Sequence, residues 1–226
     1  MFHRFTAHPS VQAFELSPPD FLARHFDASN KTRPPVPKYL ATGAIVFDRP
    51  VPSPNGPRPT SDRPPRVLLI QRAPHDSMPL KWETPGGGCD DDDPSVLYAC
   101  ARELKEEAGL KAVSVGPVIA CTTKVTSKTN GGPEDGQPEW GERMGGQFFL
   151  TRRGNLVCKF YFAVQVPEEA ASQVVVDPNE HVAFVWATEE EVRNKKTDGE
   201  NGIQLDFTHR EQFEVILEAF KIWKDI

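Results

Sequence analysis

Three glutamates near the middle of the chain have the spacing that brings carboxylates together on one face of a helix. They are Glu103, Glu106 and Glu107, within the stretch Arg102–Leu110. Because successive residues turn by about 100° in an α-helix, Glu106 and Glu107 lie about 60° and about 40° to either side of Glu103. Carboxylates this close repel one another unless a cation neutralises them. Oxygen ligands of this density suit Mg²⁺ or Mn²⁺, and these ions in turn suit phosphate substrates.

A separate stripe of the same helix is apolar and is expected to face a core. It lies about 100–160° from Glu103 and consists of Leu97, Ala101, Leu104 and Ala108. The helix is predicted over about residues 94–108, because proline is accepted in a first helical turn and Gly109 is suited to end a helix. The acidic residues 90–93 favour its positive end. One face therefore packs while the neighbouring face collects negative charge.

The segment Gly88–Leu110, called the box segment below, resembles the Nudix box. The family pattern is G-x5-E-x7-R-E-U-x-E-E-x-G-U, in which U is a bulky apolar residue. Gly88 matches the first glycine, and Arg102–Leu110 match the last nine positions without a gap. One position departs from the pattern, since Pro94 stands where the family has its isolated glutamate. Asp93, the residue before it, is a candidate substitute for that carboxylate.

The resemblance implies a fold, a reaction and a set of site residues. The fold is an α/β/α sandwich with a mixed central sheet, and the reaction is hydrolysis of a phosphoanhydride in a nucleoside diphosphate linked to another moiety. Mg²⁺ or Mn²⁺ is the implied cofactor. We expect Glu103, Glu106 and Glu107 to bind the metal together with the Gly88 carbonyl, and Glu103 either to bind it or to accept the proton of the attacking water. Arg102, also a catalytic candidate, is turned about 100° from Glu103, so it is expected to form an ion pair with a neighbouring carboxylate and fix its rotamer.

The general base and the substrate stay open at this stage. Candidate bases are Glu180 and the loop residues Glu134, Asp135, Glu139 and Glu142, although solvated acids are more common at such positions. Candidate phosphate contacts are Arg72, Lys124, Lys128, Arg152 and Arg153. His75, His181 and His209 lack ligand spacing, which favours ordinary surface or packing roles. The downstream residues that mark ADP-ribose, dinucleoside polyphosphate and NADH hydrolases in the family are missing, beginning with Val125 where a proline is expected.

Two other interpretations remain. A catalytically inactive Nudix-fold protein that binds nucleotides or regulates a partner is favoured by Pro94 and opposed by the intact glutamates. An acidic helix that docks another protein predicts no effect of divalent metal on stability.

The composition excludes some partners. The 226 residues carry a formal net charge of −6, so binding to a nucleic-acid polymer is not expected. Apolar runs are too short to cross a bilayer, and residues 1–30 contain no secretory signal. The four cysteines have no metal-site spacing, which favours a reduced, cytoplasmic protein. The expected partner is a small phosphorylated substrate, and the resemblance leaves both a monomer and a homodimer open.

Pattern and composition also predict the organisation of the chain. Residues 1–37 form an N-terminal arm packed on a hydrolase domain of residues 38–226, with loop insertions near 48–65 and 127–146. Alternating or continuous apolar residues predict strands at 38–47, 66–71, 110–126, 147–166 and 183–186. Apart from the box helix, helices are predicted at 19–25, 189–193 and 208–224, the last with the capping-box spacing of Thr208 and Glu211.

Overall fold

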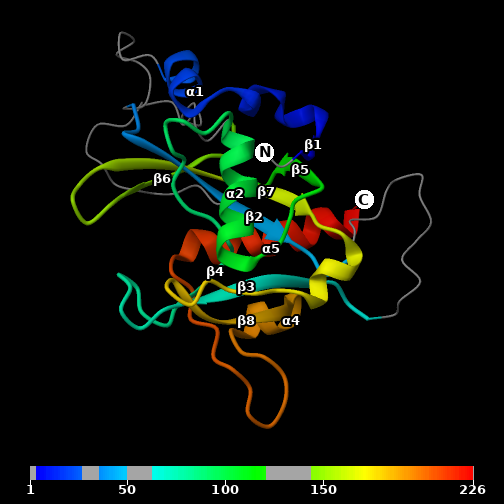
Figure 1. Ribbon diagram of the computed structural model, residues 1–226. Coiled ribbons are helices and arrows are strands. Elements are labelled where there is room, and N and C mark those ends of the chain that lie inside the picture. Colours follow the sequence, from blue (N-terminus) through cyan, green and yellow to red (C-terminus); the bar gives the residue numbers. More distant parts are fainter. Residues whose placement is uncertain (1–3, 27–35, 50–62, 121–143, 226) are drawn as a thin grey trace, which may run out of the picture.

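The computed structural model describes residues 4–26, 36–49, 63–120 and 144–225, and it has an α/β fold with two sheets (Figure 1). The strands are β1 (Thr6–Ala7), β2 (Tyr39–Val46), β3 (Arg66–Arg72), β4 (Trp82–Glu83), β5 (Ser114–Val118), β6 (Gln147–Leu150), β7 (Leu156–Gln165) and β8 (His181–Thr188). The α-helices are α1 (Pro18–His25), α2 (Val96–Ala108), α4 (Glu189–Asn194) and α5 (Arg210–Asp225), and the 3-10 helices are η1 (Pro9–Glu15) and η2 (Glu168–Ser172).

The first sheet is mixed, as predicted. Its strand order is β1-β5-β7-β2, and β6 also pairs with β7. The long central pair, β2 with β7, is parallel, whereas β5 and β6 both run antiparallel to β7. The second sheet, in the order β4-β3-β8, is antiparallel throughout. Helix α2 crosses one side of β2 and β7, and α5 packs on the other side (Figure 1). The predicted α/β class with a mixed sheet is therefore confirmed.

The central strands divide their side chains between two cores. Residues such as Leu40, Ala44 and Phe160 pack with α2, whereas their alternate neighbours, such as Ile45 and Tyr161, pack with α5. Because successive side chains of a strand point to opposite faces, a strand buried on both faces is apolar throughout. This explains why β2, β3 and β7 are continuous apolar runs in the sequence.

Helix α2 buries its predicted apolar stripe. The side chains of Leu97, Ala101, Leu104 and Ala108 are each at most 4% exposed. Ser95 caps the helix by accepting a hydrogen bond from the Tyr98 N–H, and Gly109, with φ 71°, ends it. The helix thus begins at Val96, two residues later than predicted, and Pro94 precedes the cap.

Two further predictions need correction. Of the strand predicted at 110–126, the described residues 110–120 form only β5, and its pairing with β7 shifts register between Val115 and Val118 around Pro117, which has no N–H to donate. Residues 121–126 lie outside the described residues, as do 50–62 and 127–143 of the predicted loops. The Thr208 hydroxyl donates to Gln212 Oε1, whereas a capping box is found at the start of α4.

Aromatic side chains join the N-terminal residues to the first sheet. Phe14 is 2% exposed and lies 5.0 Å from Phe21, 4.9 Å from Phe160 and 5.1 Å from Phe162 between ring centroids. The Val96 N–H donates to the Leu16 carbonyl at 3.0 Å, so this region also contacts the first turn of α2. The division into an arm at 1–37 and a domain at 38–226 stays a prediction. Within the described residues, none of the helices combines the length and apolar character needed to cross a membrane.

Replacing Phe14 by alanine is expected to lower the free energy of unfolding by about 3–5 kcal/mol, because it leaves a cavity among three aromatic rings. Chemical denaturation measures the change. Phe184→Ala, at a side chain that is 41% exposed on β8, is the matched control and should cost about 1 kcal/mol or less. Equal losses in both variants would contradict a structural role for the N-terminal contacts.

Candidate functional site

A glycine-rich segment lies beside β2 and separates α2 from a large cavity. We call residues 84–89 the glycine loop. Its Gly87 carbonyl accepts from the Thr42 N–H at 2.9 Å, and the Cys89 N–H donates to the Leu40 carbonyl at 2.9 Å. At Gly86, with φ 148°, a Cβ would lie 2.2 Å from the Thr42 carbonyl oxygen. The close approach to β2 therefore requires glycine at this position.

Glycine at position 87 leaves space for a carboxylate of α2. A Cβ on Gly87 would lie 2.7–2.9 Å from the carboxyl atoms of Glu103. Any larger residue would therefore push Glu103 away from the glycine loop. The Glu103 side chain is 13% exposed, and burial, partly offset by Arg102, raises the pKa of this carboxyl group.

Glu107 is the most buried of the three box glutamates. Its side chain is 8% exposed, and its carboxylate accepts a hydrogen bond from the Gly86 N–H at 2.6 Å. Burial raises the pKa of Glu107 to about 9, and the nearby carboxylates of Glu83 and Glu103 add to the rise. The position therefore holds a carboxylate that is costly to ionise unless a cation is bound beside it.

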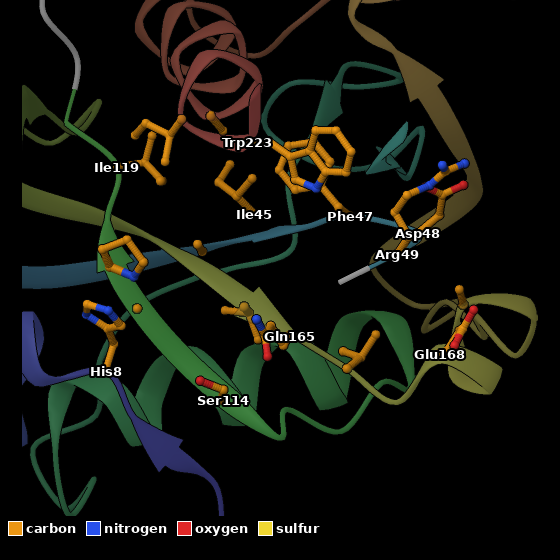
Figure 2. A pocket seen from close by; sticks show the side chains of 18 of the residues that line it. His8, Ile45, Phe47, Asp48, Arg49, Ser114, Ile119, Gln165, Glu168 and Trp223 are labelled. Carbon is orange, nitrogen blue, oxygen red and sulfur yellow. The ribbon is translucent and has the colours of Figure 1, made fainter. Parts of the chain in front are cut away.

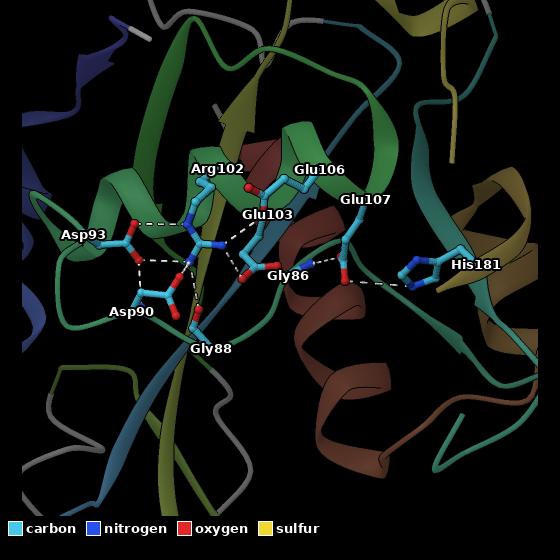
Figure 3. A network of polar contacts seen from close by, with 9 residues as sticks. All are labelled: Gly86, Gly88, Asp90, Asp93, Arg102, Glu103, Glu106, Glu107 and His181. Atoms are coloured by element: carbon cyan, nitrogen blue, oxygen red, sulfur yellow. Dashed lines mark hydrogen bonds and ion pairs between the residues drawn. The ribbon is translucent and has the colours of Figure 1, made fainter. Parts of the chain in front are cut away.

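Arg102 forms the ion pairs predicted for it and contacts five residues of the box segment, including Asp90 at 3.5 Å (Figure 3). Its Nη1 donates to Glu103 Oε1 at 2.8 Å and to Glu106 Oε2 at 3.0 Å. Its Nη2 donates to the Gly88 carbonyl at 3.0 Å. Together with the hydrogen bonds to Asp93, which contribute most, these contacts raise the pKa of Arg102. The guanidinium thus fixes the carboxylates of Glu103 and Glu106 next to one another.

Asp93 supplies a carboxylate near the position where the family pattern has glutamate. It binds Arg102 at both oxygens, Oδ1 to Nε at 3.0 Å and Oδ2 to Nη2 at 2.9 Å. Its side chain is 4% exposed, and Oδ2 also accepts from the Asp90 N–H at 2.8 Å. Two parallel, charge-assisted hydrogen bonds fix both the position and the rotation of the guanidinium. The carboxylate missing at Pro94 is thus provided one residue earlier.

The sequence predicts an ordinary surface or packing role for His181, but the structure places it beside the box glutamate Glu107. Its ring is 2% exposed, and Nε2 lies 3.4 Å from Glu83 Oε1 and 4.0 Å from Glu107 Oε1 (Figure 3). Ligand atoms of Glu107, Glu180 and His181 all lie within 4.8 Å of one another. These residues come together because the start of β8 pairs with the end of β3, which no sequence spacing reveals.

The donor set fits a hard divalent cation. Carboxylate oxygens dominate it, and the buried Glu107 is flanked by the further carboxylates of Glu83 and Glu103. Among the described residues, the cluster of Glu107, Glu180 and His181 is the one group that meets the geometric requirement for three ligands. Glu103 and Glu106 are held by Arg102 instead, and the Gly88 carbonyl also accepts from it. The assignment of Glu103, Glu106, Glu107 and Gly88 as ligands stays a prediction.

A cavity of about 860 Å³ opens on the other side of the glycine loop. Its floor is formed by β2, β6 and β7, and its wall by the start of α5. The aromatic residues of its lining are Tyr39, Phe148, Phe149 and Tyr161, and the basic ones are Arg72, Arg152, Arg153, Lys159 and His209. The other predicted bases and phosphate contacts lie outside the described residues; they are Lys124, Lys128, Glu134, Asp135, Glu139 and Glu142. A substrate in this cavity would contact the glycine loop directly.

A second cavity, of about 380 Å³, lies at the opposite end of β7 (Figure 2). Ile45, Phe47, Ile119 and Trp223 give it a largely apolar lining, and Asp48 and Arg49 lie at its edge. No residue of the box segment lines it. The chemistry that the glutamates can perform therefore belongs to the larger cavity.

Comparison with known proteins identifies the family. The model of the NUDIX domain matches residues 59–205, which is more than half of the chain. The chain belongs to the NUDIX family. This membership makes it a hydrolase of phosphoanhydride bonds, and it implies nucleoside diphosphate derivatives as the substrates. A comparison with curated proteins finds no match.

Solved structures are similar to this chain at low sequence identity. A Nudix hydrolase from M. Smegmatis, RenU, is 17% identical with a TM-score of 0.50, over 84% of this chain and 88% of that chain. The NUDIX domain of Shewanella oneidensis NrtR, complexed with ADP ribose, is 17% identical with a TM-score of 0.49, over 90% and 96%. The MutT protein of Methanosarcina mazei Go1 is 17% identical with a TM-score of 0.48, over 83% and 96%.

Replacing Asp93 by asparagine is expected to weaken Mn²⁺ binding roughly 10–100-fold, because Arg102 loses the charged partner that orients it towards Glu103 and Glu106. Isothermal titration with Mn²⁺ measures the loss. Adding Pro94→Glu to this variant returns a carboxylate to the family position and should recover part of the affinity. Asp92→Asn, at the exposed neighbouring residue, is the control. If Asp92→Asn and Asp93→Asn bind Mn²⁺ alike, Asp93 does not position the site.

The metal-free protein is expected to lose stability as the pH rises from about 5 to about 9. The folded state keeps a proton on Glu107, whose pKa is about 9, that the unfolded chain releases near its ordinary pKa of about 4.3. Because the unfolded state binds fewer protons in this window, the free energy of unfolding falls with pH. Denaturation in EDTA at several pH values tests this. Glu107→Gln should flatten the dependence, whereas Glu190→Gln, on the exposed side of α4, should leave it unchanged.

Proposed function

We propose that this protein hydrolyses a phosphoanhydride in a nucleoside diphosphate linked to another moiety, in a reaction that depends on Mg²⁺ or Mn²⁺. The observation that supports this most strongly is the buried Glu107 carboxylate, which contacts the glycine loop beside the large cavity. An inert acidic helix would keep its carboxylates in water, whereas Glu107 is 6% exposed. Burying a carboxylate among other carboxylates is costly, and a divalent cation removes that cost.

The residues have separate roles in this proposal. Glu106 and Glu107 bind the metal with the Gly88 carbonyl, and Glu180 and His181 are further candidate ligands next to Glu107. A bound divalent ion neutralises phosphate oxygens and lowers the pKa of the attacking water. Glu103, held by Arg102 against the glycine loop, binds the metal or accepts the proton of that water. Arg102 acts through these carboxylates and not on the substrate, because its donors are occupied by the box segment.

Lys159 is a basic residue of the cavity lining whose charge interacts with the buried carboxylates of Glu83 and Glu107. Its alkyl chain passes Gly43, and Nζ lies 5.1 Å from the centre of the Tyr161 ring. Burial lowers the pKa of Lys159, but the surrounding Tyr161, Glu83 and Glu107 outweigh this and raise it, so the amine stays protonated. A protonated amine between the glycine loop and the cavity is suited to bind a phosphate oxygen of the substrate.

The alternative is a NUDIX-fold protein without catalysis that binds nucleotides or regulates a partner. Pro94 is the feature that favours it, and the contacts of Asp93 with Arg102 weaken that argument. We also propose that the protein is cytoplasmic and that its partner is a small phosphorylated substrate. The proposal allows either a monomer or a homodimer.

Glu107→Gln is expected to lower metal-dependent hydrolysis by more than the roughly 10–100-fold that loss of a supporting contact costs. The assay measures release of phosphate or nucleotide with Mg²⁺ or Mn²⁺ from nucleotide sugars, ADP-ribose, dinucleotides, oxidised nucleoside triphosphates and diphosphoinositols. Glu190→Gln is the control, and melting temperatures show that each variant is folded. A wild-type protein that binds metal but leaves the whole panel intact would favour the alternative.

A further inference from the structure

Arg152 and Arg153 lie at the tip of a hairpin on the cavity wall, away from the box glutamates. The turn Thr151–Asn155 connects β6 to β7, and it is closed by the Thr151 N–H, which donates to the Asn155 carbonyl at 2.9 Å. Asn155 also donates its N–H to the Thr151 hydroxyl at 3.1 Å. The two arginines are therefore held by a defined turn, and both line the same cavity as Gly86 and the rest of the glycine loop.

Neither arginine forms an ion pair with a carboxylate of the described residues, whereas the other arginine of the cavity lining, Arg72, does. Arg72 forms ion pairs with Asp76 and Glu83, and Lys159 is influenced by the charges of Glu83 and Glu107. Arg152 instead donates its Nη2 to the Ser77 carbonyl, across the mouth of the cavity. That contact fixes the guanidinium and brings no carboxylate of the described residues to its charge.

The charges of the lining favour an anion at this end of the cavity. Of its two carboxylates, Glu83 is paired with Arg72, and Glu211 lies in the first turn of α5 on the opposite wall. Lys38 adds a further amine beside the hairpin, with Nζ 3.3 Å from Asn155 Oδ1. The whole chain has a net charge of −6, so this local cluster of basic side chains has the opposite sign to the chain as a whole. Arginine pairs are well suited to phosphate, which accepts several charge-assisted hydrogen bonds at once.

We propose that Arg152 and Arg153 form a subsite for a phosphate group of the substrate other than the diphosphate that is cleaved. The inference rests on the proposed function, because it places the diphosphate at the glycine loop and the additional phosphate at the hairpin. The substrate class is a nucleoside diphosphate derivative with a further phosphate monoester on the moiety that extends along the cavity. Phe148 and Phe149 of β6, next to the hairpin, provide an aromatic surface for a ring between the two anionic groups.

Matched ligands that differ by one phosphate test the proposal. ADP-ribose is compared with its 2′-phosphate, and NADH with NADPH, by isothermal titration of the full chain in EDTA at low ionic strength. We expect the phosphorylated member of a pair to bind roughly tenfold or more tightly, since a hydrogen bond to a charged group is worth about that factor or more. The preference should shrink as salt is added, because both arginines are exposed.

Variants assign the preference to the hairpin. Arg153→Ala, which removes no described contact, is expected to reduce the preference to about twofold or less, and Arg153→Lys to keep most of it. Arg152→Ala should act in the same direction, with its melting temperature measured because the bond to Ser77 is lost. Arg193→Ala, at an exposed arginine of α4, is the matched control and should not change the preference.

The outcomes separate this subsite from the proposed reaction. Equal affinity within each pair, or no binding of either member, overturns the subsite. If the pairs bind equally while one member is hydrolysed with Mg²⁺ or Mn²⁺, the reaction stands and the subsite is wrong. If the phosphorylated members bind more tightly but nothing in the panel is hydrolysed, the subsite stands as a binding site and the proposed reaction is wrong.

Discussion

The close contact between α2 and the glycine loop is the constraint on which the rest of the site depends. The loop follows the edge of β2 through backbone hydrogen bonds, so it cannot move away from the sheet without breaking them. Helix α2 is fixed on its other side by Leu97 and Leu104 in the core. Glu103 and Glu107 are therefore held against the loop, where glycine at position 86 allows the close approach to β2 and glycine at position 87 leaves room for Glu103. The same helix therefore packs into the core through its leucines and places its carboxylates at the glycine loop.

Charge in this protein is organised around two arginine sites with opposite roles. Arg102 is surrounded by acids, and its donors are used to hold the box segment together. Arg152 and Arg153 of the hairpin line a cavity in which one carboxylate, that of Glu83, is paired and the other, that of Glu211, lies on the opposite wall. In the proposed function, an acidic chain binds an anionic substrate, which requires local reversals of sign that a divalent ion would supply at one end of the cavity and basic side chains at the other.

Sequence patterns predicted the elements whose signal is local. The stripe of α2, the strands β2 and β7 and the helix end at Gly109 all follow from periodicity and from glycine chemistry. Within the described residues 110–120, the strand predicted at 110–126 is shortened to β5, and the register shift around Pro117 in its pairing with β7 was not predicted. The start of α2 moved to Val96 because Ser95 is the better cap, a side-chain hydrogen bond that competes with the proline signal.

By itself the sequence determined the family resemblance, the three glutamates with the spacing of one helix face, and the pairing of Arg102 with a carboxylate. The glutamate face and the pairing of Arg102 depend on residues within one helical turn of each other, so spacing is enough to predict them. The tertiary structure decided which partner Arg102 takes in place of the missing glutamate, and that His181 meets Glu107. It also decided that the hairpin arginines face the same cavity as the glycine loop. These contacts join segments that are far apart in the chain, and their positions follow from the register of β2, β3, β7 and β8, which local periodicity does not specify.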